Sequence, residues 1–305
     1  MNVVKPEFVV REAKASDKDS VLRFCQDTFE WGDYIGNVWD YWLTDPGGRL
    51  FVATHEDVAV GVSHVAMIKR GEAWAEGARV APEFRRMGVA SLLNDSLFEW
   101  ASGHGAKVVR AVTDSTNLVA QKALDKMGFE LVSDWVLMEF DGCQLEASKH
   151  ARLAGRPDVD AIWTFLQGSR GFRKSGGLFA GVFRWQSLSK SELQKFADRH
   201  MTVVCERDKA VYGLILFDDS VQSAWRENSL QTCYVEGDFE ACLDMGRFLK
   251  GISYERGIAK IYGFMHNSAP FTSSFSELGF RSGGHSEFIY ARKLVSRVSS
   301  CIAGR

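Results

Sequence analysis

The turn at Arg85-Arg86-Met87-Gly88 is the part of the sequence best suited to chemistry. It follows an apolar strand pattern that ends at Val80, and it opens directly into a helical pattern that begins at Val89. Backbone N–H groups at a helix start, together with the helix dipole, favour a phosphate group, and glycine lets the backbone approach that anion closely. The turn therefore predicts a phosphate or pyrophosphate site; the alternative is a solvated basic turn. The absence of a G-x-x-x-x-G-K-[ST] run excludes an ordinary P-loop.

Alternating strand and helix patterns surround this turn and must position it. The predicted strands of the first half cover residues 9–12, 50–54, 58–69, 72–80, 107–113 and 130–140. The predicted helices begin at Ser16 or Asp17 and at residues 34, 89 and 118. This order predicts the α+β fold class, with a mixed, mostly antiparallel central sheet flanked by helices.

The first half of the chain recurs in the second half at a constant offset. Identical residues at this offset are the pairs Arg11/Arg152, Ala13/Ala154, Asp17/Asp158, Asp19/Asp160 and Phe24/Phe165. Each half also ends a helical segment on a Gly-Phe pair, at Gly128-Phe129 and Gly279-Phe280. Matches that recur in the same order indicate duplication. We therefore expect domains at residues 1–142 and 148–294, followed by a C-terminal tail at residues 295–305.

The strand, turn and helix around Gly88 resemble the GCN5-related N-acetyltransferases, the GNAT superfamily. The acetyl-CoA loop of that family is similar to the R-x-x-G-x-[GA] string, which here follows a strand ending in V-x-P. The opening V-R-x-A-x-x-x-D string, and the N-x-x-A string at Asn117 followed by Met127-Gly-Phe129, match the family in the same order. The resemblance covers residues 8–140 and, more weakly, residues 150–293. It implies two tandem GNAT folds, the second of them degenerate.

This resemblance implies that acetyl-CoA is the cofactor. Backbone groups of residues 78–80 would serve the pantetheine arm, and residues 85–90 would wrap the pyrophosphate. The implied cofactor-binding residues are Ala78, Arg79, Val80, Arg85, Arg86, Met87, Gly88, Val89, Ala90, Ser91 and Asn117. In the second copy, Glu236, Asp238 and Glu240 stand where arginines are needed and would repel a pyrophosphate, so we expect no CoA there.

Acetyl transfer to an amine needs a neutral amine and a proton for the departing thiolate. Glu76 is the candidate catalytic base, because it lies on the strand that enters the turn. Strand alternation places its side chain on the face of Glu72, Trp74 and Val80. The alternative is that Glu76 is an exposed acid or the partner of a salt bridge.

Two positions depart from the family pattern. Many members have a tyrosine, acting as an acid toward the thiolate, at the position of Leu124, and some have a glutamate at the position of Val112. Leucine cannot donate a proton. Tyr34, Ser115 or solvent must then protonate the thiolate, and the sequence leaves these alternatives open.

The segment of residues 29–46 is dense in aromatic and acidic residues and is the candidate acceptor side. Aromatic faces with nearby carboxylates suit an amine or a cation. The candidate substrate-binding residues are Trp31, Asp33 and Tyr34. The other interpretation is that these aromatics fill the core, above all Trp39 and Trp42. The D-Y-x-x-x-x-W-x-x-W-L-x-D-P string, followed by E-G-x-R-V-x-P, also resembles the histidine N-acetyltransferase-like branch, which implies an amino acid or similar small amine as acceptor.

We therefore expect an N-acetyltransferase that moves an acetyl group from acetyl-CoA to the primary amine of a small molecule by direct attack in a ternary complex. One alternative is a peptide or protein N-terminal acetyltransferase. Another is a non-catalytic acyl-CoA-binding protein, suggested by Leu124 and the degenerate second half. A third is a tandem transferase similar to mycothiol synthase.

Composition limits the partners of the chain. Its 37 Lys and Arg against 39 Asp and Glu argue against a sequence-independent nucleic-acid binder. No apolar run approaches the roughly 18 residues that span a bilayer. The six scattered cysteines predict reduced thiols, with no metal site and no disulfide framework. We expect a cytoplasmic monomer or homodimer without nucleic-acid or membrane partners, in which the lone histidines His64 and His104 are packed or on the surface rather than catalytic.

Overall fold

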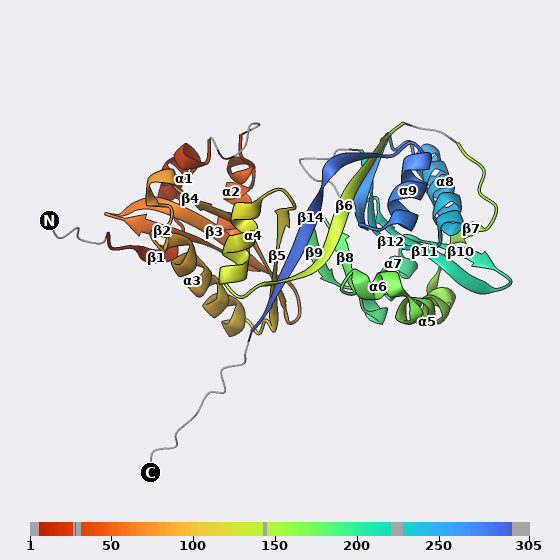
Figure 1. The fold of residues 1–305 in the computed structure, drawn as a ribbon, viewed down its shortest axis with the longest axis horizontal. Helices are drawn as coiled ribbons and strands as arrows, with labels where there is room; N and C mark the ends of the chain where they lie inside the picture. Colours follow the sequence, from red (N-terminus) through yellow and green to blue (C-terminus); the bar gives the residue numbers. More distant parts are fainter. Residues whose placement is uncertain (1–5, 27, 29–31, 143–144, 221–227, 295–305) are drawn as a thin grey trace, which may run out of the picture. The chain divides into compact units, whose positions relative to one another are not determined.

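The computed structural model describes residues 6–26, 28, 32–142, 145–220 and 228–294 (Figure 1). The chain divides into two compact units. Unit 1 contains residues 1–111, 122–130 and 291–305, and unit 2 contains residues 112–121 and 131–290. Each unit combines a mixed sheet with helices, so the predicted α+β class is confirmed.

The units do not follow the boundary expected between residues 142 and 148. Strand β6 (Glu130–Asp141), from the first half of the chain, pairs antiparallel with β13 (Lys260–His266) of the second half, and residues 131–142 belong to unit 2. The last strand, β14 (Arg281–Lys293), is divided between the units: residues 281–290 belong to unit 2 and residues 291–293 to unit 1. A strand joins the sheet edge that completes its hydrogen bonds, and the sequence repeat does not encode that choice. The ranges 1–142 and 148–294 therefore remain a prediction of where the two copies of the sequence repeat lie, and they do not describe the two packed units.

Unit 1 is an antiparallel meander to which one parallel strand is added. Its strands are β1 (Val9–Glu12), β2 (Gly48–His55), β3 (Val58–Lys69), β4 (Glu72–Val80) and β5 (Val108–Asp114), in that order across the sheet. Pairing is antiparallel as far as β4, and β5 pairs parallel to β4. Its helices are α1 (Lys18–Cys25), α2 (Ile35–Thr44), α3 (Val89–Gly103) and α4 (Leu118–Lys126), although residues 112–121 of β5 and α4 cluster with unit 2. The elements expected from the sequence are all present, within a few residues at each end.

The two faces of the unit 1 sheet carry different helices. A Cβ atom at Gly61 would lie 2.9 Å from Val89 and 3.1 Å from Leu93, so α3 covers that face closely. The next residue, Val62, points to the opposite face and packs in a buried cluster with residues of α1 and α2, including Trp39 and Trp42. Both tryptophans are therefore core residues, as one interpretation of the sequence held.

Unit 2 repeats this arrangement. Its strands β7 (Ala151–Leu153), β10 (Thr202–Arg207), β11 (Ala210–Asp218) and β12 (Ser229–Gly237) pair antiparallel, and β13 pairs parallel to β12. Beyond β13 the order continues with β6 and β14. Its helices are α5 (Val159–Gly168), α6 (Arg170–Lys174), α7 (Lys190–Asp198), α8 (Phe239–Glu255) and α9 (Ala269–Glu277), and β8 (Leu178–Gly181) and β9 (Arg184–Ser187) form a separate hairpin.

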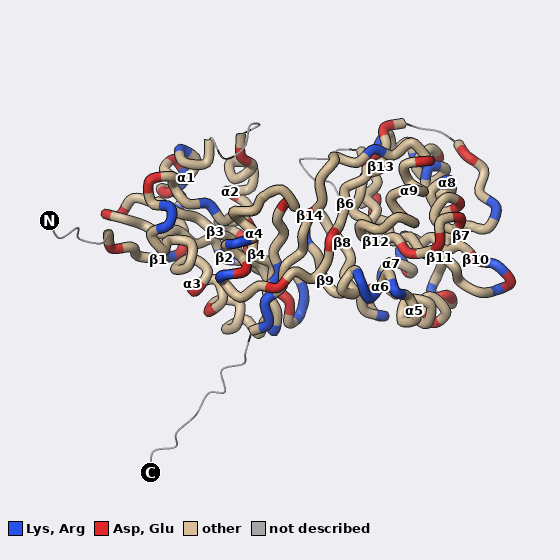
Figure 2. The backbone as a smooth tube through the Cα atoms, viewed as in Figure 1, with Lys and Arg blue, Asp and Glu red and all other residues tan. Residues whose placement is uncertain are grey.

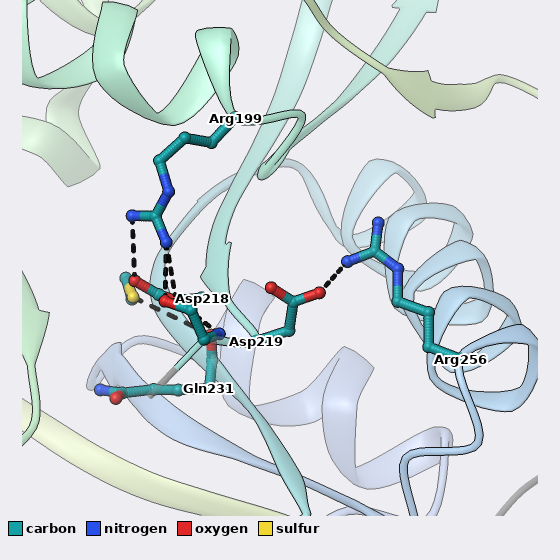
Figure 3. A network of polar contacts seen from close by, with 7 residues as sticks. Arg199, Asp218, Asp219, Gln231 and Arg256 are labelled. Atoms are coloured by element: carbon teal, nitrogen blue, oxygen red, sulfur yellow. Dashed lines mark hydrogen bonds and ion pairs between the residues drawn. The ribbon is translucent and has the colours of Figure 1, made fainter. Parts of the chain in front are cut away.

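Ion pairs fix the helix ends of unit 2 near the end of β11 (Figure 3). Arg199, which follows α7, contacts Asp218 at 3.3 Å and donates to Ser220 at 2.7 Å. Arg256, which follows α8, pairs with Asp219 and lies over the Phe217 ring. Because Arg199 and Arg256 are partly exposed, these contacts position the chain more than they stabilise it.

Charges of both signs are interspersed along the strands and helices of each unit (Figure 2). This agrees with the nearly balanced composition. None of the helices among the described residues is long and apolar enough to cross a membrane. Four cysteines in the described residues, Cys25, Cys205, Cys233 and Cys242, are buried free thiols.

Candidate active site

The turn between β4 and α3 presents its backbone outward. It continues from a short 3-10 turn (Pro82–Phe84) through Arg86 at φ 64° and Gly88 at φ 95°, after which α3 begins. The backbone N–H groups of residues 86–90 make no hydrogen bond of normal geometry to any residue that the structure describes. A Cβ atom at Gly88 would meet nothing within 4 Å. Backbone N–H donors and open space therefore occur together at the start of α3, and a bound anion needs both.

The arginines of this turn differ in their contacts. Nε of Arg85 donates to the carbonyl of Val80 at 3.1 Å, which ties its side chain to the end of β4. Arg86 is exposed, and within the described residues no acceptor holds its guanidinium. Nη1 of Arg79 donates to the carbonyl of Ala78 at 3.1 Å. The carbonyls of Ala78 and Val80, expected to serve the pantetheine arm, therefore both accept a hydrogen bond from an arginine.

Strand β4 separates from β5 before it reaches the turn. Their parallel ladder ends at the Trp74–Arg110 pair, although β4 continues to Val80. The last paired stretch is fixed by a buried ion pair in which Nη1 of Arg110 lies 2.6 Å from Oε2 of Glu72. The separation leaves one edge of β4 open where the resemblance places an extended cofactor arm.

Glu76 lies on the face of the sheet that carries α1 and α2. In the register of β3 and β4, His64 is opposite Glu76 and Val62 is opposite Arg79, so β4 has one extra residue between these pairs. Gly77, at φ 69°, lies in this bulge, and a Cβ atom there would be 2.5 Å from the Trp42 ring. The expectation that Glu76 shares its face with Val80 is therefore wrong, because the bulge changes the alternation and brings Arg79 to that face.

The partner of Glu76 is a residue that the sequence did not mark as functional. Nδ1 of the fully buried His64 lies 3.0 Å from Oε1 of Glu76, and Nε2 lies 3.6 Å from Oδ2 of Asp45. The sequence already predicted a hairpin between residues 58–69 and 72–80, and such a hairpin places His64 across from residues near Glu76. This pairing was the only sign in the sequence that His64 could contact Glu76. A regular hairpin would pair His64 with Gly77; a bulge near Lys69 shifts the register by one residue.

The predicted acceptor residues have distinct environments. Asp33 is buried and binds Arg79, with Oδ2 at 2.7 Å from Nε, while the guanidinium lies over the Tyr34 ring. Burial raises the pKa of Tyr34 to about 12, against the opposing effect of Arg79, and the carboxylates of Glu76 and Asp33 raise it further. Tyr34 therefore keeps its proton at neutral pH. Trp31 lies outside the described residues.

Comparisons with known proteins agree with this geometry. The profile of the Acetyltransferase (GNAT) family matches residues 19–129, which include β4, the turn and α3. Residues 19–129 of the chain therefore form a GNAT-type acetyltransferase domain. It is similar to the Histidine N-acetyltransferase of Oreochromis niloticus, with 32% identity over 82 residues, 27% of this chain and 24% of that protein. It is also similar to the Probable N-acetyltransferase 16 of Homo sapiens, with 29% identity over 151 residues, 48% of this chain and 40% of that protein.

The curated relatives are therefore matched over less than half of their own length. Among solved structures, the GCN5-related N-acetyltransferase of Sphaerobacter thermophilus aligns with a TM-score of 0.59 and 16% identity. That alignment covers 94% of this chain and 95% of the other. At this identity the likeness shows the fold alone, and it extends through both halves of the chain.

Other GNAT positions named from the sequence lie near the end of β5. Asn117 caps α4, with its Oδ1 accepting from the N–H of Ala120 at 3.0 Å. Oγ of Ser115 accepts from the N–H of Ser286 at 3.1 Å. Leu124 is half-buried on α4. The role of Asn117 beside the cofactor stays a prediction, because it clusters in unit 2 whereas the turn belongs to unit 1.

The corresponding junction in unit 2 differs from the GNAT turn of unit 1. Only Asp238 stands between β12 and α8, whereas residues 81–88 separate β4 from α3. Its Oδ1 accepts from the N–H of Ala241 at 2.7 Å, so a carboxylate already occupies this helix start. Glu236 accepts from the Tyr234 hydroxyl at 2.8 Å, and burial raises the pKa of this carboxyl. Both acids line a groove of about 810 Å³ beside α5, which disfavours an anion there.

Proposed function

We propose that this chain is an N-acetyltransferase that transfers an acetyl group from acetyl-CoA to the primary amine of a small molecule such as an amino acid. The observation that carries the proposal is the turn around Gly88, where Arg86 and backbone N–H groups that make no hydrogen bond of normal geometry lie beside open space at the start of α3. GNAT enzymes generally use acetyl-CoA as the acyl donor. The similarity to a histidine N-acetyltransferase supports an amino acid as the acceptor.

The residues of the turn fit the pyrophosphate of CoA. N–H groups of residues 86–90 would donate to its oxygens, and Arg86 would add a mobile positive charge. The open edge of β4 at Ala78 and Val80 would receive the pantetheine arm once the arginine contacts to their carbonyls give way. Acetyl-CoA supplies the thioester that makes the acetyl carbonyl reactive toward an amine.

Proton transfer is assigned to the face that carries α1 and α2. Glu76 would take the proton of the acceptor amine as the N–C bond forms and the C–S bond breaks. Tyr34 is partly buried beside Arg79 on the same face and holds its proton, so it is a candidate donor to the departing thiolate. Ser115 and solvent remain the other candidates.

A screen for acetyl-CoA-dependent thiol release tests the activity and its acceptor class. Free amino acids and polyamines are compared with short peptides bearing a free N-terminus. We expect release with a free amino acid and little with peptides. Preference for peptides would favour the N-terminal acetyltransferase alternative, and binding of acetyl-CoA without any turnover would favour a non-catalytic acyl-CoA-binding protein.

The variant Glu76→Gln tests the base. We expect kcat to fall by about 100-fold or more at neutral pH, because an amide cannot accept the proton, while acetyl-CoA affinity is kept. Glu83→Gln, at an exposed glutamate of the same turn, is the matched control and should leave kcat unchanged. Unchanged turnover in Glu76→Gln would remove the base assignment.

Calorimetry tests the proposed inactivity of unit 2 toward the donor. We expect one acetyl-CoA per chain, since Asp238 occupies the start of α8 and Glu236 lies beside it. A stoichiometry of two would contradict this part of the proposal.

A further inference from the structure

His64 lies between two carboxylates in unit 1. Its Nδ1 is 3.0 Å from Oε1 of Glu76, and its Nε2 is 3.6 Å from Oδ2 of Asp45, an ion-pair contact rather than a hydrogen bond. The imidazole is 0% exposed, and the side chains of Asp45 and Glu76 are 9% and 15% exposed. All three groups are therefore largely removed from water.

The surrounding residues leave the imidazole no freedom to turn away. The Trp42 ring stacks on it at 4.6 Å between centroids, with 2° between the planes. At the edge of the imidazole, Gly48 of β2 lies so close that a Cβ atom there would be 2.7 Å from Nε2 of His64 and 2.5 Å from Oδ2 of Asp45. Only glycine fits at this position, so the backbone of β2 closes the space around the pair.

The positions of the carboxylates determine the charge of the ring. A neutral imidazole has one N–H and one lone pair, and here the lone pair would face a carboxylate in either tautomer. An imidazolium instead directs an N–H toward both Asp45 and Glu76 and places its charge over the Trp42 face. Near this cluster, Tyr34 is neutral, and Asp33 holds Arg79. Glu12 and Arg49, which pair with each other at 3.3 Å, line a small pocket beside Trp42 and Gly48.

We propose that His64 is a positioning residue for Glu76. As an imidazolium held by Asp45, it donates Nδ1–H to Oε1 of Glu76, fixes that carboxylate and keeps it ionised. Held in this orientation, the carboxylate of Glu76 takes the proton of the acceptor amine, while His64 keeps both of its own protons throughout. This inference rests on the proposed acetyltransferase function and on Glu76 as its base.

Kinetics of His64→Gln test the inference. We expect kcat to fall by about 10- to 100-fold with little change in KM for acetyl-CoA, as for other groups that orient a catalytic residue. We also expect the acid limb of the kcat profile to move to higher pH by about one unit, because Glu76 loses its cation and binds a proton more readily. Asp45→Asn should move the acid limb of the kcat profile in the same direction but by less than about one unit, because Asp45 acts on Glu76 only through His64.

A histidine in a similar aromatic setting provides the control. His104 stacks on Trp100 at 4.0 Å, but its Nδ1 donates to the backbone carbonyl of Trp100 at 2.8 Å, and the side chain is exposed. His104→Gln should leave both kcat and the pH profile unchanged. A purely structural role for His64 predicts that His64→Gln lowers stability but leaves kcat per folded molecule and the acid limb as in the parent chain. That result would overturn the inference.

Nitrogen-15 spectra of the histidine rings decide the charge independently of activity. The signals of His64 are assigned by their loss in His64→Gln, and we expect two protonated nitrogens at pH 7. A neutral ring at that pH overturns the inference. Failure of the proposed function is distinguishable, because no acceptor would then be acetylated by the parent chain, whereas the spectra still report the state of His64.

Discussion

Nε of Arg79 lies 2.7 Å from Oδ2 of Asp33, and this ion pair connects β4 to the segment that precedes α2. The side chains are only 16% and 3% exposed. The guanidinium also lies over the Tyr34 ring, whose edge meets Trp42 at 6.0 Å between centroids. The pair therefore fixes Tyr34 on the same face of the sheet as Glu76.

Asp33→Asn is expected to destabilise unit 1 by about 2 kcal/mol, because it removes the carboxylate charge that pairs with the largely buried guanidinium of Arg79. Urea unfolding measures this loss. The matched control is Asp40→Asn, since Asp40 pairs with Lys18 at 2.8 Å but its side chain is 79% exposed. The control should cost less than about 0.5 kcal/mol. Equal losses in the two variants would show that the Arg79 pair does not anchor this segment.

Gly88→Ala tests the anion site in the turn. Its left-handed φ and a new Cβ in the open space of the turn should lower acetyl-CoA affinity by about 10-fold or more. Gly105, after the C-terminal end of α3, also has a left-handed φ, 81°, and nothing within 4 Å of its Cβ position. Gly105→Ala carries the same backbone strain at the other end of the helix, so calorimetry should find its acetyl-CoA affinity unchanged. If both variants lost acetyl-CoA affinity to the same extent, backbone strain alone would explain the effect, and the turn at Gly88 would not be the anion site.

Tyr34→Phe tests the donor to the thiolate. With a pKa of about 12, the phenol stays protonated through pH 10, so it can supply a proton over the whole neutral range. We expect kcat to fall by about 10- to 100-fold without a change in acetyl-CoA affinity. Ser115→Ala is compared in the same assay. If only the serine variant loses kcat, the donor is Ser115, and if neither does, solvent protonates the thiolate.

The fold of unit 1 could be predicted because its elements are encoded locally. Apolar alternation in β3 and β4 and helical spacing in α3 match the structure within a residue or two. The turn at Gly88 was also recognisable, since a glycine and arginines between a strand and a helix are a local pattern. The ion pairs Arg11–Asp17 and Arg152–Asp158 take equivalent places in the two halves, which agrees with the repeat.

Features that depend on register and on distant pairing were not predictable. The bulge at Gly77 reversed the alternation after Glu76, and the bulge near Lys69 set His64 opposite that glutamate. An isolated glycine within a strand pattern, such as Gly77, marks a possible bulge but does not specify the register that results. The pairing of β6 with β13 likewise depends on which sheet edge is open, which the sequence repeat leaves unspecified.

The partly buried pair of Arg11 and Asp17 makes the stability of unit 1 depend on pH. The hydrogen bond from Arg11 lowers the pKa of the Asp17 carboxyl below its usual value, with burial acting in the opposite direction. A lowered pKa in the folded state means that the stabilisation is complete above the unfolded value of about 4 and is lost as the pH falls through the folded value. Nη1 of Arg11 lies 2.7 Å from Oδ2 of Asp17, and the N–H of Lys14 donates to the same oxygen at 2.7 Å.

Asp17→Asn should therefore lower the free energy of unfolding by about 1–2 kcal/mol at pH 7, and the difference from the parent chain should shrink below pH 4 as Asp17 is protonated there. Urea titrations at pH 7, 4 and 2.5 measure this difference. Asp158→Asn is the matched variant in unit 2, where Arg152 is 43% exposed and also binds Glu206, so its effect should be smaller. A difference for Asp17→Asn that stays constant from pH 7 to pH 2.5 would show that its cost comes from the altered turn and not from the charge.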